Sequence, residues 1–339
     1  MRHFPVKRMI VMASKMKERI SDEVESMLAS GDGKRLVMAA LKEIKRELST
    51  LIDVQAKQNM VKEVARDDLQ TRLSVYKELA IASITRTLSA LYVTAIVQLV
   101  IYTQVFQLLR LKRMGKAPHE LVQRKYLSMM KYFAIACGQV NFLQSVVEKV
   151  ERGVTLYYDR VNHGEMYDEE KVEEMLKFVR RETETDENDW IIMLLRDLSN
   201  SYVAECLNPD DAANSAEEIM MGVRMENGLS KQLENLAGDF EEILESDVFA
   251  ETLITVEEKC FQTLGTQLKE RVFHSSTELE SEPRQVQSVP FLRIVPPFSN
   301  MFADVLNAQM DVQLQYGDIV LKSHACKEYF EAIYHAGRP

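Results

Sequence analysis

The sequence predicts an all-α protein, built as a bundle of helices, and three observations support this prediction. The chain has 339 residues, of which 46% are hydrophobic, so it can bury a large core. It contains only 12 Gly and 8 Pro, and no proline lies between Pro5 and Pro118, so long helices are permitted across the first third. Few segments alternate apolar and polar residues with a period of two, so strands are not expected.

The 3.6-residue periodicity of apolar residues and the positions of helix breakers place the expected helices. They lie at 14–29, 35–64, 69–113, 119–152, 168–182, 187–205, 215–245, 248–275, 299–318 and 322–335. The motif Gly31-Asp32-Gly33-Lys34 resembles the end of a phosphate-binding P-loop, but the first glycine is misplaced and no Ser or Thr follows Lys34. We interpret this motif as the end of one helix and the start of the next.

The run 87–109 contains no charged residue, and it is long enough to cross a bilayer, which needs about 20 residues. Its polar residues would be costly in hydrocarbon. At about 100° per residue they occupy two opposite sides of a helix, which leaves no clean lipid-facing side. They are Thr87, Thr94 and Gln98 on one side, and Ser89, Thr103, Gln104 and Gln107 on the other. We therefore expect a helix surrounded by other protein helices.

Helix breakers divide the rest of the chain. Gly115 and Pro118 end the long helix, and an apolar helix at 119–150 then returns, which predicts an antiparallel hairpin of helices. Further breaks are expected at 165–170, 182–189, 208–211 and 274–297.

The charge distribution limits the classes of partner. The net charge is −10, which speaks against nucleic acid as the main partner. Residues 1–20 are the basic exception, and their apolar patch at 9–13 is too short for a membrane span or a signal-peptide core. The four cysteines are widely spaced without a CxxC motif, which indicates reduced thiols and neither a disulfide nor a zinc framework.

No motif supports catalysis. The pair Asp67-Asp68 lacks a third carboxylate at the spacing of helical isoprenoid synthases, and Asp210-Asp211 follows Pro209, where a turn and a helix cap are expected. A stripe on the last helix has residues of metal-binding type, but its opposite face is apolar, as in an ordinary surface helix. The stripe consists of His324, Glu328, Glu331 and His335. We expect no enzyme activity, no cofactor and no metal site.

A candidate binding face lies on the helix that leads into the uncharged run. Its residues share one side of the helix and combine an aromatic, two aliphatics and a cation, which is the composition of an anchor site for a partner helix. They are Arg72, Val75, Tyr76, Leu79 and Ser83. Leu73, Ala80 and Ile84 project about 90° away and are expected to pack inward. The alternative is that Tyr76 packs beneath a neighbouring helix.

The segment 289–297 is the second unusual feature. Prolines near both ends disfavour a helix, and its five apolar residues need cover. These are Val289, Phe291, Leu292, Ile294 and Val295. We expect the segment to pack across the bundle with Arg293 pointing outward, or to supply part of a partner site.

Several stretches occur in the same order as in the peroxin-3 family, the membrane docking receptors of peroxisome biogenesis, which the chain resembles. They are 73–109 with Tyr76, Lys77-Glu78-Leu79, Ile84-Thr85-Arg86-Thr87 and Tyr92; 122–130 with the sequence VQRKYLSMM; 244–264; and 289–296. The resemblance covers 35–339 in scattered blocks.

The resemblance implies a single large, twisted bundle of long helices that faces the cytosol at the peroxisomal membrane, or at a related organelle such as the glycosome. It implies binding of an N-terminal amphipathic helix of the cargo receptor peroxin-19, which promotes insertion of peroxisomal membrane proteins. The tryptophan anchor of the family corresponds to Tyr76, its neighbouring basic residue to Arg72, and the lysine of its proline-bounded loop to Arg293. The partner-binding residues expected here are Arg72, Val75, Tyr76, Leu79 and Arg293.

The N-terminus departs from the family, which carries a transmembrane anchor there. Residues 1–20 cannot span a bilayer, so we expect a basic segment at 1–20 with a missing or altered anchor, followed by a docking domain at 21–339. A helical scaffold or adaptor with another partner is the second reading, and a metal-dependent helical enzyme of the isoprenoid type is the third.

Overall fold

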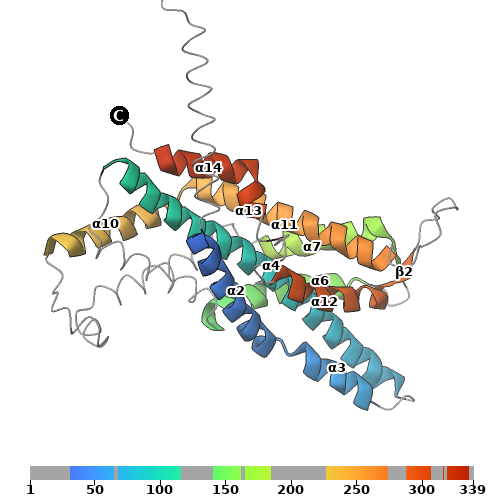
Figure 1. Ribbon diagram of the computed structural model, residues 1–339. Helices are drawn as coiled ribbons and strands as arrows, with labels where there is room; N and C mark the ends of the chain where they lie inside the picture. Colours follow the sequence, from blue (N-terminus) through green and yellow to red (C-terminus); the bar gives the residue numbers. More distant parts are fainter. Residues whose placement is uncertain are drawn as a thin grey trace, which may run out of the picture.

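The computed structural model describes residues 31–64, 68–115, 140–161, 165–184, 227–273, 288–306, 316 and 319–335, and over these residues the protein is all-α (Figure 1). The helices are α2 (Gly31–Leu51), α3 (Val54–Glu63), α4 (Leu69–Arg113), α6 (Val140–Tyr158), α7 (Glu169–Glu184), α10 (Asn227–Leu244), α11 (Asp247–Phe273), α12 (Val295–Val305), α13 (Ile319–Lys322) and α14 (His324–His335). A short antiparallel pair joins β1 (Met166–Tyr167) to β2 (Val289–Pro290), and the 3-10 helix η1 (Phe291–Arg293) follows β2.

Most of the expected helices are found, and the differences have local causes. The helix expected at 35–64 is divided, because Asp53 caps the start of α3 by accepting a hydrogen bond from the Ala56 amide at 2.9 Å. Helix α12 begins at Val295 and not at 299, because prolines are tolerated in the first turn, where amide donors have no partner within the helix. Helix α12 also ends at Val305, before the expected end at 318. The expected helices at 14–29 and 187–205, and the first parts of 119–152 and 215–245, lie outside the described residues.

Helix α4 is the buried centre of the fold. It runs through the middle of the molecule, and α2, α3, α6, α11, α12 and α14 all pack against it (Figure 1). Its most apolar 18-residue window is long and hydrophobic enough to cross a membrane, yet 94% of that window is buried within the protein. The prediction of a helix enclosed by other helices is therefore confirmed, and both of its polar sides are covered.

The uncharged polar residues of α4 bind the surrounding segments. Each of the following four makes a hydrogen bond to a different segment of the chain. They are Thr87 to the Phe298 carbonyl of α12 (2.7 Å), Gln98 to the Tyr316 carbonyl (3.2 Å), Thr103 to the Tyr329 hydroxyl of α14 (2.9 Å) and Gln107 to the Leu236 carbonyl of α10 (2.8 Å). A typical hydrogen bond adds only about 1 kcal/mol to stability, but losing one partner of a buried pair costs more. These four bonds therefore fix the position of each segment along α4.

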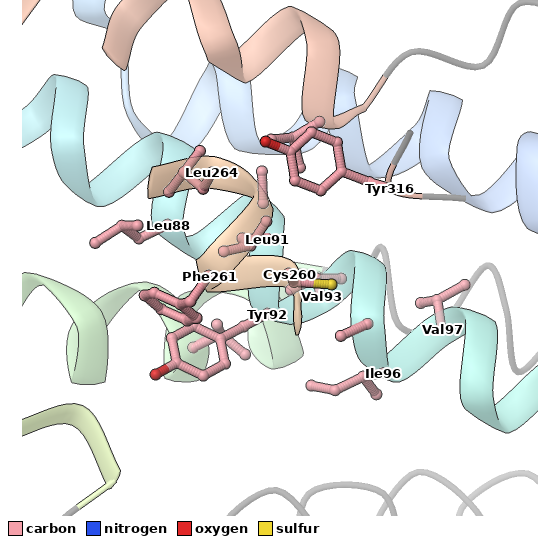
Figure 2. Close-up of a cluster of buried hydrophobic side chains, with 14 of the residues drawn as sticks. Leu88, Leu91, Tyr92, Val93, Ile96, Val97, Cys260, Phe261, Leu264 and Tyr316 are labelled. Carbon is pink, nitrogen blue, oxygen red and sulfur yellow. The ribbon is translucent and has the colours of Figure 1, made fainter. Parts of the chain in front are cut away.

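The contact between α4 and α11 shows how the core is filled (Figure 2). The ring of Tyr92 lies edge-on to the ring of Phe261, with 5.3 Å between their centroids. Edge-to-face aromatic pairs contribute about 0.5–1.5 kcal/mol beyond the area they bury. Tyr316 closes the other side of this core, and its hydroxyl donates to the Gln267 side chain of α11 at 2.8 Å.

Helices α6 and α7 approach each other closely at Gly153. A Cβ atom added at this position would lie 2.9 Å from Thr183 Oγ1 and 3.0 Å from the Val179 carbonyl oxygen. The neighbours cannot move freely, because the Thr183 hydroxyl donates to that same carbonyl at 2.8 Å. Glycine is therefore required for the spacing of this helix pair.

Gly153→Ala should destabilise the protein by about 1–3 kcal/mol, the usual cost of overpacking a close contact. Gly238→Ala is the matched control, because no atom lies within 4 Å of the added Cβ in α10. It should stabilise the protein by about 0.5–1 kcal/mol through the higher helix propensity of alanine. Urea unfolding measures both; equal effects of the two substitutions would contradict the close contact.

Candidate functional site

The predicted partner-binding residues on α4 lie near its N-terminal end. Arg72, Tyr76 and Leu79 are half-buried, and the Arg72 guanidinium lies 5.9 Å from the centroid of the Tyr76 ring, within the range of a cation–π contact. Val75 is only 6% exposed, so the expectation that it lies at the surface is wrong. Helix α3 packs along this part of α4, and Val75 supports the face from within.

The sequence predicted that Leu73, Ala80 and Ile84 pack inward, and this is correct for two of the three residues. Ala80 and Ile84 are buried, as expected. Leu73 is 49% exposed and not packed inward, which corrects the expectation. It lies in the first turns of α4, near the N-terminal end of the helix. An exposed aliphatic residue beside Tyr76 widens the apolar surface at this end of the helix.

One side of α4 changes from covered to partly covered along its length. Ser83 and Thr87 lie on the same side as Tyr76, since seven and eleven residues correspond to nearly whole turns. Both are fully buried, and the Thr87 hydroxyl lies 2.7 Å from the Phe298 carbonyl of α12. At Tyr76 this side is only half covered. Helix α12 therefore occupies the side at 83–87 and leaves it accessible at 72–79.

Ion pairs join the neighbouring helices to this part of α4. Lys57 of α3 lies 3.0 Å from Glu78, and Lys77 lies 2.6 Å from Asp159 at the end of α6. Both pairs are well exposed, so each contributes only about 0–1 kcal/mol. They show that α3 and the end of α6 lie beside the face that carries Tyr76.

The proline-bounded segment lies in the same region. Lys77 lies 5.4 Å from the centroid of the Tyr158 ring, and that ring lies 5.6 Å from the ring of Phe291. Tyr158 thus connects α4 to η1, and Arg293 follows Phe291 by two residues. Arg293 is exposed, as the sequence indicated. The structure therefore brings the two predicted parts of the site to one end of the molecule.

Segment 289–297 packs across the bundle, but one of its apolar residues is not covered. Phe291 is buried between Tyr158 and Tyr167, with 5.1 Å between the centroids of Phe291 and Tyr167. Leu292 is 38% exposed, which corrects the expectation that it needs cover. The 3-10 turn rotates Leu292 and Arg293 away from the core while Phe291 and Ile294 point into it.

Arg86 belongs to this side of α4 and was missed in the sequence, where it only marked the start of the uncharged run. Its guanidinium lies 4.3 Å from the centroid of the Phe302 ring and 3.4 Å from the Ser299 hydroxyl. Burial lowers its pKa, and the carboxylate of Asp53 partly opposes this. The sequence feature that could have predicted this position is its spacing of seven residues from Leu79. Seven residues are nearly two whole turns, so both side chains lie on one side of the helix.

Three hydrogen-bond donors on this side have no acceptor among the residues that the structure describes. They are the buried Nε atoms of Arg72 and Arg86 and the hydroxyl group of Ser83. Unsatisfied buried donors are costly, at about 1–3 kcal/mol each.

The metal-binding alternatives gain no support. His324 pairs with Glu328 at 3.3 Å on an exposed surface, whereas His335 Nδ1 lies 2.9 Å from the Arg113 guanidinium at the other end of α14. Over the described ranges, no three His, Cys, Asp or Glu residues gather in a metal-binding group. Asp68 caps α4, and hydrogen bonds from Thr71 lower its pKa. Asp67, Asp210 and Asp211 lie outside the described residues.

The two described cysteines are buried thiols and not reactive groups. Cys260 and Cys326 are both free. Burial raises the pKa of Cys326 to about 11 and that of Cys260 further still. A thiol with so high a pKa carries almost no thiolate at neutral pH and is a poor nucleophile. Cys137 and Cys206 lie outside the described residues.

No known protein-family model matches this chain, and no curated protein matches it significantly.

Phe291→Ala should destabilise the protein by about 3–5 kcal/mol, since it removes a buried ring between two tyrosines. Leu292→Ala, its exposed neighbour, should change stability by less than about 0.5 kcal/mol. Chemical denaturation compares the two variants. A loss of equal size in both would mean that η1 does not present Leu292 and Arg293 outward from an anchored Phe291.

Proposed function

We propose that this protein is a non-enzymatic docking receptor of the peroxin-3 type. It binds an N-terminal amphipathic helix of the cargo receptor peroxin-19 and so promotes insertion of membrane proteins at the peroxisome or a related organelle such as the glycosome. The domain faces the cytosol. The observation that carries the proposal is the side of α4 that α12 covers at 83–87 and that stays half-exposed at Tyr76.

The chemistry of this accessible side supports a helix as the ligand. A partner helix would lie on α4 in line with α12, so the protein already contains the packing mode that the partner would use. Tyr76 supplies an aromatic anchor, Leu79 and the exposed Leu73 supply aliphatic surface, and Arg72 lies over the Tyr76 ring. Interfaces concentrate their binding energy in a few such residues.

The charges on this side favour a partner helix that carries carboxylates. Arg72 is half-buried on the accessible part of this side, and Arg293 of η1 is exposed. Hydrogen bonds between guanidinium and carboxylate groups are stronger than neutral ones. Affinity should therefore fall as the salt concentration rises, although buried contacts are screened less than exposed ones.

A scaffold or adaptor with a different partner remains the second candidate, because the same surface would accept other amphipathic helices. Binding of peroxin-19 separates the two. If its N-terminal helix does not bind the wild-type protein, peroxin-19 is not the partner. The side of α4 that carries Tyr76 could then still bind a different helix, as the second candidate function requires.

Tyr76→Ala should weaken binding of the peroxin-19 helix by about 2 kcal/mol or more, which is about 30-fold in Kd, as expected for a central aromatic anchor. Isothermal titration calorimetry measures this. Val248→Ala is the control, because it removes an exposed apolar side chain next to Phe249, which contacts Tyr329 near the other end of α4. An unchanged Kd in a folded Tyr76→Ala protein would exclude Tyr76 from the site.

A further inference from the structure

A carboxyl group lies in the core of the bundle, on the apolar side of α11. Glu257 is 3% exposed, and its Oε1 atom has no hydrogen-bond partner within the described part of the chain. Its neighbours on the same helix side, Leu253, Cys260 and Leu264, are buried apolar residues. A core position of this kind normally holds a hydrophobic residue, so the carboxyl group requires an explanation.

The helices packed against this position contribute three polar groups. Tyr92 of α4 donates its hydroxyl to Glu184 Oε1 at 3.1 Å, and Arg180 of α7 donates to the same oxygen at 2.8 Å. Among the described residues, Arg180 supplies the guanidinium near Glu257, and it is already bonded to another carboxylate. On α11 itself, Lys259 donates to the Ser323 hydroxyl at 2.8 Å.

The charge balance of this cluster depends on one proton. With Glu257 neutral, Arg180 and Glu184 cancel each other. With Glu257 ionised, two carboxylates share one guanidinium in the core, and a buried charge without its own partner is strongly destabilising. Burial raises the pKa of Glu257 well above its ordinary value, Glu184 raises it further, and Arg180 opposes the change.

We infer that the junction of α4, α7 and α11 is closed by a protonated Glu257 and loosens when that proton is lost. The packing of α4, α7 and α11 therefore depends on the protonation of Glu257. We call this dependence the proton lock, and it is independent of the proposed docking surface. Because the folded protein holds this proton more tightly than the unfolded chain, the contribution of Glu257 to stability is fully present below its unfolded pKa of about 4.3. This contribution is lost as the pH rises towards the folded pKa.

The test compares wild type with Glu257→Gln, which keeps the shape of the side chain but cannot ionise. Over the window between the unfolded and folded pKa, the unfolding constant of wild type relative to the variant should rise about tenfold per pH unit. Urea unfolding from pH 6 to pH 8 measures it. Glu258→Gln, an exposed neighbour on α11, is the control and should show no such trend.

A second variant tests the competition for Arg180. Glu184→Gln frees the guanidinium for Glu257, so ionisation should become easier and the pH dependence should move to lower pH. A ratio of wild type to Glu257→Gln that stays constant from pH 6 to pH 8 would overturn the inference. If Glu257→Gln does not fold, wild-type protein labelled with carbon-13 at the glutamate carboxyl carbons provides the answer by NMR. One protonated carboxyl signal at pH 7 supports the lock, and its absence overturns it.

Discussion

The complete burial of an uncharged helix is the constraint on which the rest of the structure depends. Helix α4 has neither a solvent-facing nor a lipid-facing side over most of 87–104, so other helices must surround it. Its polar side chains lie on opposite sides, and each buried amide or hydroxyl needs a partner from a neighbouring segment. Thr87, Gln98, Thr103 and Gln107 form such hydrogen bonds, and these bonds link α4 to α12, Tyr316, α14 and α10.

The same constraint places the candidate docking site at the end of α4. One side of α4 runs without interruption from Arg72 to Thr87. Helix α12 contacts it at Arg86 and Thr87, whereas Tyr76 is only half-buried. The uncovered part is held rigidly, because its C-terminal continuation is buried and because α3 and α6 flank it. Binding to a preorganised surface avoids the entropic cost of ordering it, which favours recognition of a helix at this position.

The sequence predicted the fold class and the bounds of α4, because no glycine or proline interrupts 69–113 and helical periodicity is a local signal. It also predicted the side that carries Arg72, Tyr76 and Leu79. It did not predict that Val75 is buried, because this depends on how α3 packs after the break at Asp53. Glu257 escaped notice because a single Glu in a helix with many charges looks ordinary until its neighbours are known.

Hydrogen exchange in lipid-free buffer tests the central claim that α4 is a protein-enclosed spine. We expect the amides of 87–104 to be among the slowest of the described helices to exchange, with an opening free energy equal to the global free energy of unfolding from urea titration. Exchange of these amides at a much lower free energy, with protection restored only when lipid vesicles are added, would contradict the claim. It would show that the helix requires a bilayer, and the docking side would then lose its rigid support.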